Sequence, residues 1–360
     1  MENAHILTLP PEIIAEIFQA YLPAYPLCPD IFTNDSPVQL SHICSEWRQI
    51  ALFTPSLWRA IGIYAQPLGG PQTLAKKMRC IETFLERSGS YPLSIRVTGA
   101  SSPDKQSRET LIDTLLPHRA RWQYLVLHGH RSALARITGT FPQLLGAELV
   151  ASYEIINEQH PLLPQLEAPA LHSLSLWHIA LTSVPSPHQL TRIYLTNYAP
   201  VECVPFLHQC PNLVFLSVTF TDIPRDLYLL LVSLPPQKIH FPQLRTLVLQ
   251  APRSLAHVDY DIVERFLVPS VRRLQISAHL LESDPIGKIR ALVAQSGCRL
   301  DELRVLDPRW EFQRLDRLYE PEGKGLKDIA SAYQLESGGF RRAEWAEEAL
   351  PFGVGPHILS

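Results

Sequence analysis

The chain has 360 residues, of which 46% are hydrophobic, and a formal net charge of −3. It has no basic block that would bind a phosphate backbone, so we expect no nucleic-acid partner. Its apolar runs are much shorter than the roughly 18 residues of a membrane span and no basic leader opens it, so we expect no membrane contact and an intracellular location, cytoplasmic or nuclear.

Two amphipathic helices are predicted within residues 1–60. The first begins at Pro10–Pro11, where a missing N–H group costs nothing, and ends before Pro23. The second begins after Ser36 as its N-cap and carries one continuous apolar stripe, followed by a short turn. The apolar positions are Ile13, Ile14, Ile17, Phe18, Tyr21, Leu40, Ile43, Cys44, Trp47, Ile50, Ala51, Leu57 and Trp58. About 50 residues cannot bury so much apolar surface alone, so the rest of the chain or a partner must cover it.

This N-terminal motif resembles an F-box. The resemblance is carried by Leu9-Pro10-Pro11-Glu12-Ile13-Ile14, Ile17-Phe18, Leu40, Ile43-Cys44, Trp47-Arg48, Ile50-Ala51, Pro55 and Leu57-Trp58. The long, proline-rich connection from Pro23 to Ser36 departs from many F-boxes, but it is known in a fungal group of F-box proteins. The stretches Phe84–Ile95 and His118–Trp122 also resemble that group. The alternative is a plain helical hairpin that caps a repeat domain.

Residues 61–120 are predicted to link this module to the next domain and to cap it. The apolar spacing predicts a helix over Thr73–Ser88, which ends at Gly89. A first strand is expected over Tyr91–Val97, and a second helix over Arg108–Leu116.

Residues 121–307 repeat the pattern apolar-x-x-apolar-x-apolar. The copies are Trp122/Leu125/Leu127, Leu144/Ala147/Leu149, Leu171/Leu174/Leu176, Leu190/Ile193/Leu195, Leu213/Leu216/Val218, Leu244/Leu247/Leu249, Val271/Leu274/Ile276 and Leu300/Leu303/Val305. The last two positions of each copy alternate as in a short strand. The segments between copies, such as Ala199–His208 and Asp259–Leu267, are predicted to be helical or irregular returns. A proline stands two residues before the first position at Pro142, Pro169, Pro211, Pro242 and Pro269.

The fold class predicted from these patterns is α/β. We expect an N-terminal helical F-box followed by an irregular leucine-rich-repeat solenoid of parallel strands. The alternative is an ordinary α/β domain with strand–helix alternation. No asparagine regularly follows the strands, so we expect no side-chain ladder between repeats. Residues 308–360 lose the pattern and are expected to form a C-terminal cap or tail.

No catalytic site, metal site or cofactor is predicted. No histidine lies in a His-Glu-x-x-His motif, and Ser88-Gly89-Ser90 lacks the nucleophile elbow of hydrolases. None of the six cysteines forms a Cys-x-x-Cys pair, which favours reduced thiols over a zinc site or a disulfide framework.

The F-box resemblance implies a non-catalytic substrate adaptor of an SCF-type cullin–RING ubiquitin ligase. Its F-box would bind a Skp-type adaptor, and through it a cullin, while its repeats bind a protein substrate. The alternative is a repeat scaffold or an F-box protein that acts outside the ligase. The resemblance assigns adaptor binding to Leu9, Pro10, Ile13, Ile14, Ile17, Leu40, Ile43, Trp47 and Trp58. Some of these residues must instead pack inside the module, and Trp47 is the first candidate for this.

Substrate-binding residues are predicted on the strand face opposite the leucines. Trp177 and Tyr194 lie on successive strands, so their rings would be exposed neighbours of the kind found in binding hot spots. The alternative is that both rings are core beneath the C-terminal segment. The full set is Trp177, Tyr194, Thr219, Gln250 and Arg304.

Overall fold

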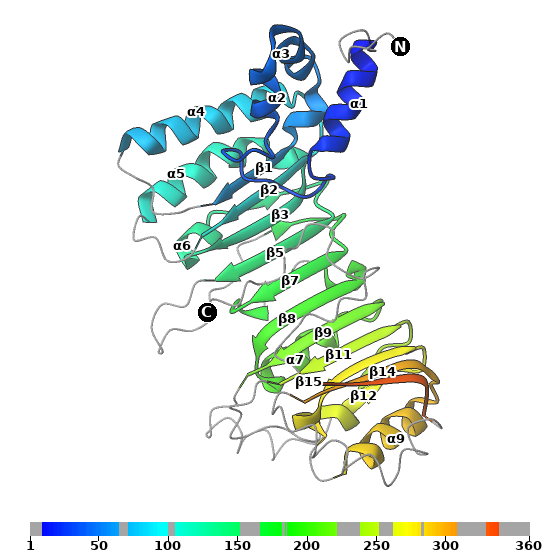
Figure 1. Ribbon diagram of the computed structural model, residues 1–360. Helices are drawn as coiled ribbons and strands as arrows, with labels where there is room; N and C mark the ends of the chain where they lie inside the picture. The colour runs from blue at the N-terminus through cyan, green and yellow to red at the C-terminus, as the bar shows by residue number, and fades with distance from the viewer. Residues whose placement is uncertain are drawn as a thin grey trace, which may run out of the picture. The chain divides into compact units, whose positions relative to one another are not determined.

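The computed structural model describes residues 9–64, 71–99, 105–151, 166–181, 184, 186–221, 238–251, 262–281, 284–307 and 329–337. It is a mixed α/β structure with helices and a large parallel sheet, and the described strands do not close into a barrel (Figure 1). The chain divides into two compact units. The first contains Met1–Leu171, and the second contains most of the chain from His172 onward.

The first unit opens with three short helices and a 3-10 turn. They are α1 (Pro11–Tyr21), α2 (Pro37–Ile43), α3 (Ser45–Leu52) and η2 (Pro55–Trp58). The predicted start of α2 is confirmed, because the Ser36 hydroxyl accepts a hydrogen bond from Val38 N. The prediction of one continuous second helix is wrong. Cys44 is extended between α2 and α3, and its Sγ accepts a hydrogen bond from Trp47 N at 3.4 Å, which caps α3.

The strands of the first unit pair in chain order, and all are parallel. They are β1 (Ala60–Tyr64), β2 (Leu93–Thr98), β3 (Trp122–Gly129) and β5 (Gly146–Ala151). The predicted helices before β2 and β3 are present as α4 (Pro71–Arg87) and α5 (Lys105–Leu115). The prediction that the sheet begins with the strand near Tyr91 is wrong, because β1 precedes it. Strand pairing therefore begins before residue 121, inside the expected linker and cap.

Shorter elements complete the described part of the first unit. They are η3 (Leu116–Arg121), α6 (Arg131–Leu134), β4 (Gly139–Thr140) and β6 (Leu166–Glu167). Strands β4 and β6 pair in parallel as a separate two-stranded sheet.

The strands of the second unit also pair in parallel and in chain order. They are β7 (Ser173–Trp177), β8 (Arg192–Tyr198), β9 (Phe215–Phe220), β11 (Thr246–Gln250), β13 (Arg273–Ser277), β14 (Leu300–Asp307) and β15 (Ala330–Ser337). β15 lies in the C-terminal segment where no strand was predicted.

The predicted repeat positions come into register across these strands. The second apolar position forms one row, Leu174, Ile193, Leu216, Leu247, Leu274 and Leu303. The third forms the next row on the same face, Leu176, Leu195, Val218, Leu249, Ile276 and Val305. Every member of both rows is buried. The prediction that these positions alternate as in a strand is therefore confirmed.

The described segments between strands of the second unit contain short helices, 3-10 turns and short strands. They are η5 (Pro187–Gln189), α7 (Pro200–Leu207), β10 (Ile239–His240), η6 (Ile262–Arg265), β12 (Phe266–Leu267), η7 (Ala278–Leu280) and α9 (Pro285–Ser296). The predicted return over Ala199–His208 is confirmed as α7. In the predicted return over Asp259–Leu267, residues 259–261 lie outside the described residues, and the rest forms η6 and β12.

The prolines that precede the repeats occupy β-turns. Leu144 N donates to Phe141 O at 3.3 Å, which closes a turn with Pro142 at its second position. The same backbone bond closes the turns that contain Pro169, Pro242 and Pro269. Proline suits this position because its ring presets the backbone angle φ that the turn requires. These four prolines thus direct the chain into β5, β7, β11 and β13.

Tyr198 links two repeats where an asparagine ladder was absent from the sequence. Its buried hydroxyl donates to Ile179 O at 2.7 Å and accepts from Ile179 N at 3.0 Å. Ser277 plays a similar role, because its hydroxyl accepts a hydrogen bond from Ala251 N at 3.1 Å. These two side chains therefore connect neighbouring repeats without the asparagine ladder that the sequence lacks.

Replacing Tyr198 with Phe should lower the free energy of unfolding of the second unit by about 1–3 kcal/mol, because it removes a partner from two buried backbone groups of Ile179. Urea unfolding measures this change. Tyr91→Phe is the control, because Tyr91 is exposed and its change should be within about 0.5 kcal/mol. Equal unfolding midpoints for Tyr198→Phe and the wild type would contradict the link.

Candidate functional site

The helices of the first unit expose apolar side chains. Ile13 is 48% exposed, Ile43 is 60% exposed and Phe53 is 80% exposed. We call the following residues the exposed apolar set: Leu9, Pro10, Ile13, Ile17, Tyr21, Ile43 and Phe53. The F-box resemblance assigned five of them to adaptor binding. Tyr21 was predicted on the apolar face of the first helix but not assigned to adaptor binding, and Phe53 was not predicted at all.

Helix α1 is apolar on two sides. Ile14 and Phe18 are buried, and Phe18 packs against Trp47 of α3 with 4.8 Å between ring centroids. Ile13, Ile17 and Tyr21 stand at successive i, i+4 positions, so they share another face of the helix, and that face is exposed. A helix of a monomeric protein normally buries one stripe only. The second stripe of α1 is therefore available to a partner.

Three of the assigned adaptor-binding residues, Ile14, Leu40 and Trp58, belong to the core of the first unit. Trp58 Nε1 donates to Ala51 O at 2.8 Å, and its ring lies 5.0 Å from the ring of Phe84 on α4. These side chains are therefore not accessible to a partner in this conformation. Trp47 also packs inside the module, against Phe18, but it is half-buried and so less enclosed than these three residues.

The connection from Pro23 to Ser36 joins the helices to the sheet. Ile31 N donates to Gly62 O at 3.0 Å, so the loop runs beside β1. The Ser94 hydroxyl of β2 donates to Pro26 O at 2.6 Å and lies 3.1 Å from the Cys28 thiol. Burial raises the pKa of that thiol to about 11, so the thiol stays protonated at neutral pH.

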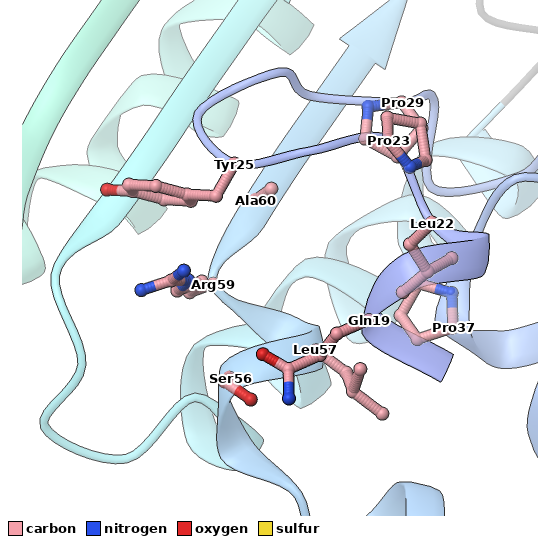
Figure 2. Close-up of a pocket in the computed structure, with 10 residues that line it drawn as sticks. All are labelled: Gln19, Leu22, Pro23, Tyr25, Pro29, Pro37, Ser56, Leu57, Arg59 and Ala60. Atoms are coloured by element: carbon pink, nitrogen blue, oxygen red, sulfur yellow. The ribbon is translucent and has the colours of Figure 1, made fainter. Parts of the chain in front are cut away.

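A small cavity of about 70 Å³ lies where α1, this loop, η2 and β1 meet (Figure 2). Its polar lining comes from Gln19, Ser56 and Arg59. The Arg59 guanidinium lies 3.9 Å from the centre of the Tyr25 ring. Burial raises the pKa of Tyr25, so its hydroxyl stays protonated and donates to Gln123 Oε1 at 2.9 Å. Ligand pockets are typically about 300 Å³ or more, so this cavity is better suited to joining the elements than to holding a cofactor.

The five predicted substrate-binding residues share one face of the second unit's strands. Trp177, Thr219 and Gln250 stand in one row of the strand register, and Tyr194 and Arg304 stand in the neighbouring row. The structure therefore places all five in two adjacent rows, on the face opposite the leucines.

The expected exposure of these five residues is only partly present. Tyr194 and Gln250 are each 7% exposed, so the prediction of an exposed aromatic pair is wrong at Tyr194. Its ring packs 4.7 Å from the ring of Phe215 on β9. Trp177, Thr219 and Arg304 are half-buried.

Three of the predicted polar side chains on this face are already hydrogen-bonded within the chain. The Thr219 hydroxyl donates to Gln250 Oε1 at 3.2 Å. Arg304 Nε donates to Glu302 Oε1 at 2.7 Å, so the two side chains form an ion pair.

The described residues contain no cluster of His, Cys, Asp and Glu side chains that could hold a metal ion. Within the same part of the chain, no helix is both long enough and apolar enough to cross a membrane. A comparison with models of known protein families finds no match to the sequence, and a comparison with curated proteins finds none either.

Proposed function

We propose that this chain is the substrate-recognition adaptor of an SCF-type cullin–RING ubiquitin ligase. Helices α1–α3 act as an F-box that binds a Skp-type adaptor, and the strand region binds a protein substrate. The observation that carries the proposal is the exposed apolar set, which lies beside a packed core of Ile14, Phe18, Leu40, Leu57 and Trp58 in the same module. Exposed apolar side chains in such numbers mark interaction surfaces, and the F-box resemblance indicates which partner they meet.

The finer architecture belongs to the same proposal. We infer that the parallel strands are those of an irregular leucine-rich-repeat solenoid. The two buried rows of leucine-like residues support this inference, as do the proline turns that recur before the strands. Stacked repeats present one strand face along their length as a binding surface. Trp177, Thr219 and Arg304 are the accessible members of that face, while Tyr194 and Gln250 support it from within.

The double change Ile13→Asp, Ile17→Asp tests the adaptor site. Both residues lie on the exposed side of α1, so two carboxylates there should leave the unit folded and abolish co-purification with a Skp-type adaptor. Each hot-spot contact of this kind is worth about 2 kcal/mol or more. The measurement is co-purification of the intact chain with the adaptor, beside a thermal unfolding curve of each variant.

Two controls make this result specific. Glu12→Gln alters an exposed polar position of the same helix and should change neither binding nor folding. Ile14→Ala alters the buried side of α1 and should lower the unfolding temperature. Undiminished adaptor binding by the folded Ile13→Asp, Ile17→Asp variant would refute the F-box assignment.

Recovery of a cullin separates the ligase adaptor from the alternative. A ligase adaptor should bring down a cullin with the Skp-type protein and should be autoubiquitinated in the reconstituted complex. Recovery of the Skp-type protein without a cullin would instead favour an F-box protein that acts outside the ligase.

A further inference from the structure

A second candidate binding site is lined by residues of the first unit that do not belong to the exposed apolar set. A groove of about 390 Å³ runs between α2, α3 and α4 in the first unit, and Figure 1 shows these helices close together. We call it the α2–α4 groove and define it by Val38, His42, Arg48, Leu52, Trp58 and Arg87. Its volume lies in the range of ligand pockets. Apart from Trp58, none of these six residues was assigned to adaptor binding.

The groove is basic. His42, Arg48 and Arg87 line it, and none of its lining residues is acidic. Within the described part of the chain, the Arg48 side chain makes one hydrogen bond, from Nε to Ser41 O at 2.8 Å. That bond orients the guanidinium group and leaves its other N–H groups free to donate. An oriented guanidinium is suited to binding a carboxylate through two parallel hydrogen bonds.

Arg87 is held at the groove by a different contact. Its guanidinium lies 4.4 Å from the centre of the buried Trp58 ring, an attractive cation–π arrangement. Across the described residues, the Arg87 side chain has no hydrogen-bond or ion-pair partner. Arg87 also influences the groove wall at Cys80, where burial raises the pKa of the thiol and the Arg87 charge opposes that rise. Two oriented guanidinium groups without an acidic partner thus face one groove.

The walls add an apolar component. Val38 on α2 and Leu52 on α3 are both half-exposed and line the groove beside the basic groups. A small inorganic anion would leave these apolar walls in water. A peptide that carries an acidic residue beside an apolar one would meet both kinds of surface. The combination of charge and apolar walls therefore favours a peptide as the occupant.

We propose that the α2–α4 groove binds an acidic peptide segment of a protein partner, with Arg48 and Arg87 holding its carboxylates and Val38 and Leu52 contacting its apolar side chains. This site is separate from the exposed apolar set, so the proposal does not depend on adaptor binding.

Fluorescence anisotropy of the full chain tests the proposal. The probe is a fluorescein-labelled peptide of Glu-Glu-Leu repeats, compared with the same peptide carrying Gln in place of Glu. We expect the acidic peptide to bind at least about tenfold more tightly, as one charge-assisted hydrogen bond suffices for that difference. Arg48→Gln should lower the affinity for the acidic peptide about tenfold and leave the affinity for the Gln peptide unchanged. Arg48→Lys keeps the charge but lacks the planar guanidinium group, so its affinity for the acidic peptide should fall less.

Arg79→Gln is the matched control, because Arg79 is exposed on α4 but does not line the groove. It should leave affinity unchanged, and a thermal unfolding curve should show that every variant is still folded at the temperature of the binding measurement. Hydrogen exchange adds a readout on the wild-type chain, since the acidic peptide should slow exchange in α2 and α4. The proposal is overturned if the Gln peptide binds as tightly as the acidic one. It is equally overturned if Arg79→Gln weakens binding as much as Arg48→Gln, or if the acidic peptide neither binds nor slows exchange.

Discussion

Replacement of Trp58 by Ala is expected to lower the free energy of unfolding of the first unit by about 3–5 kcal/mol, as for other large aromatic residues in cores. Trp58 is fully buried and packs edge-on against Phe84 of α4. Its Nε1 donates to Ala51 O, and Arg87 covers its face. The substitution would remove all of these contacts and leave a cavity between η2, α3 and α4.

Hydrogen exchange in increasing urea measures this effect locally. In the variant, the amides of α3 and α4 should be the first to lose protection as the urea concentration rises. Trp58→Phe is the graded control, because it can keep the contact with Phe84 but removes the Nε1 donor. It should therefore lower the free energy of unfolding less than Trp58→Ala does. If Trp58→Ala abolished adaptor binding without lowering stability, Trp58 would be a contact residue, as the F-box resemblance implies, and its structural role would be refuted.

The helix starts and the strand rows could be predicted because local signals determine them. Proline at the first helical position and serine at the N-cap mark the starts of α1 and α2 without any tertiary information. The alternation of leucine-like residues marks the strands equally well, since one face of each strand is buried along its length. A pattern that depends only on burial and backbone geometry can be read from the residues themselves.

The break between α2 and α3 could not be predicted by the same reasoning. The apolar stripe continues from Leu40 through Cys44 to Trp47, and cysteine is not among the preferred N-cap residues. In the structure the Cys44 thiol nevertheless accepts the cap hydrogen bond. Tyr198 is a similar case, because a tyrosine hydroxyl bonds neighbouring repeats in a chain whose sequence lacks an asparagine ladder.

Strand β1 depends on a contact that is distant in sequence. Its residues Ala60–Tyr64 include Gly62, which weakens the strand signal. The structure shows why a glycine stands there, since the backbone of Pro29 approaches it closely. In the same way, burial of Tyr194 and Gln250 depends on tertiary packing of the second strand face. No alternation pattern in β8 or β11 contains that information.

Gly62→Val is expected to release the Pro23–Ser36 loop from β1. A Cβ atom on Gly62 would overlap the Pro29 carbonyl oxygen and lie 2.8 Å from Cys28 O. Both are backbone atoms that cannot rotate away. Cys28 and Ile31 are buried when the loop is docked, and the burial of Ile31 alone is worth about 1.5–3 kcal/mol. Because the loop joins α1 to α2, its release would also loosen the packing of α1 on α3, where Phe18 contacts Trp47.

Hydrogen exchange at Ile31 N measures docking directly, because this amide is bonded to Gly62 O in the folded chain. Gly62→Val should exchange faster there, and α1 should lose protection with it. Gly89→Ala separates steric overlap from backbone strain. Gly89 has a φ of +54° with no atom within 4 Å of an added Cβ, so its substitution strains only the backbone, by about 1–2 kcal/mol, and should leave Ile31 protected. Slow exchange of Ile31 in Gly62→Val would show that the loop does not depend on this close approach.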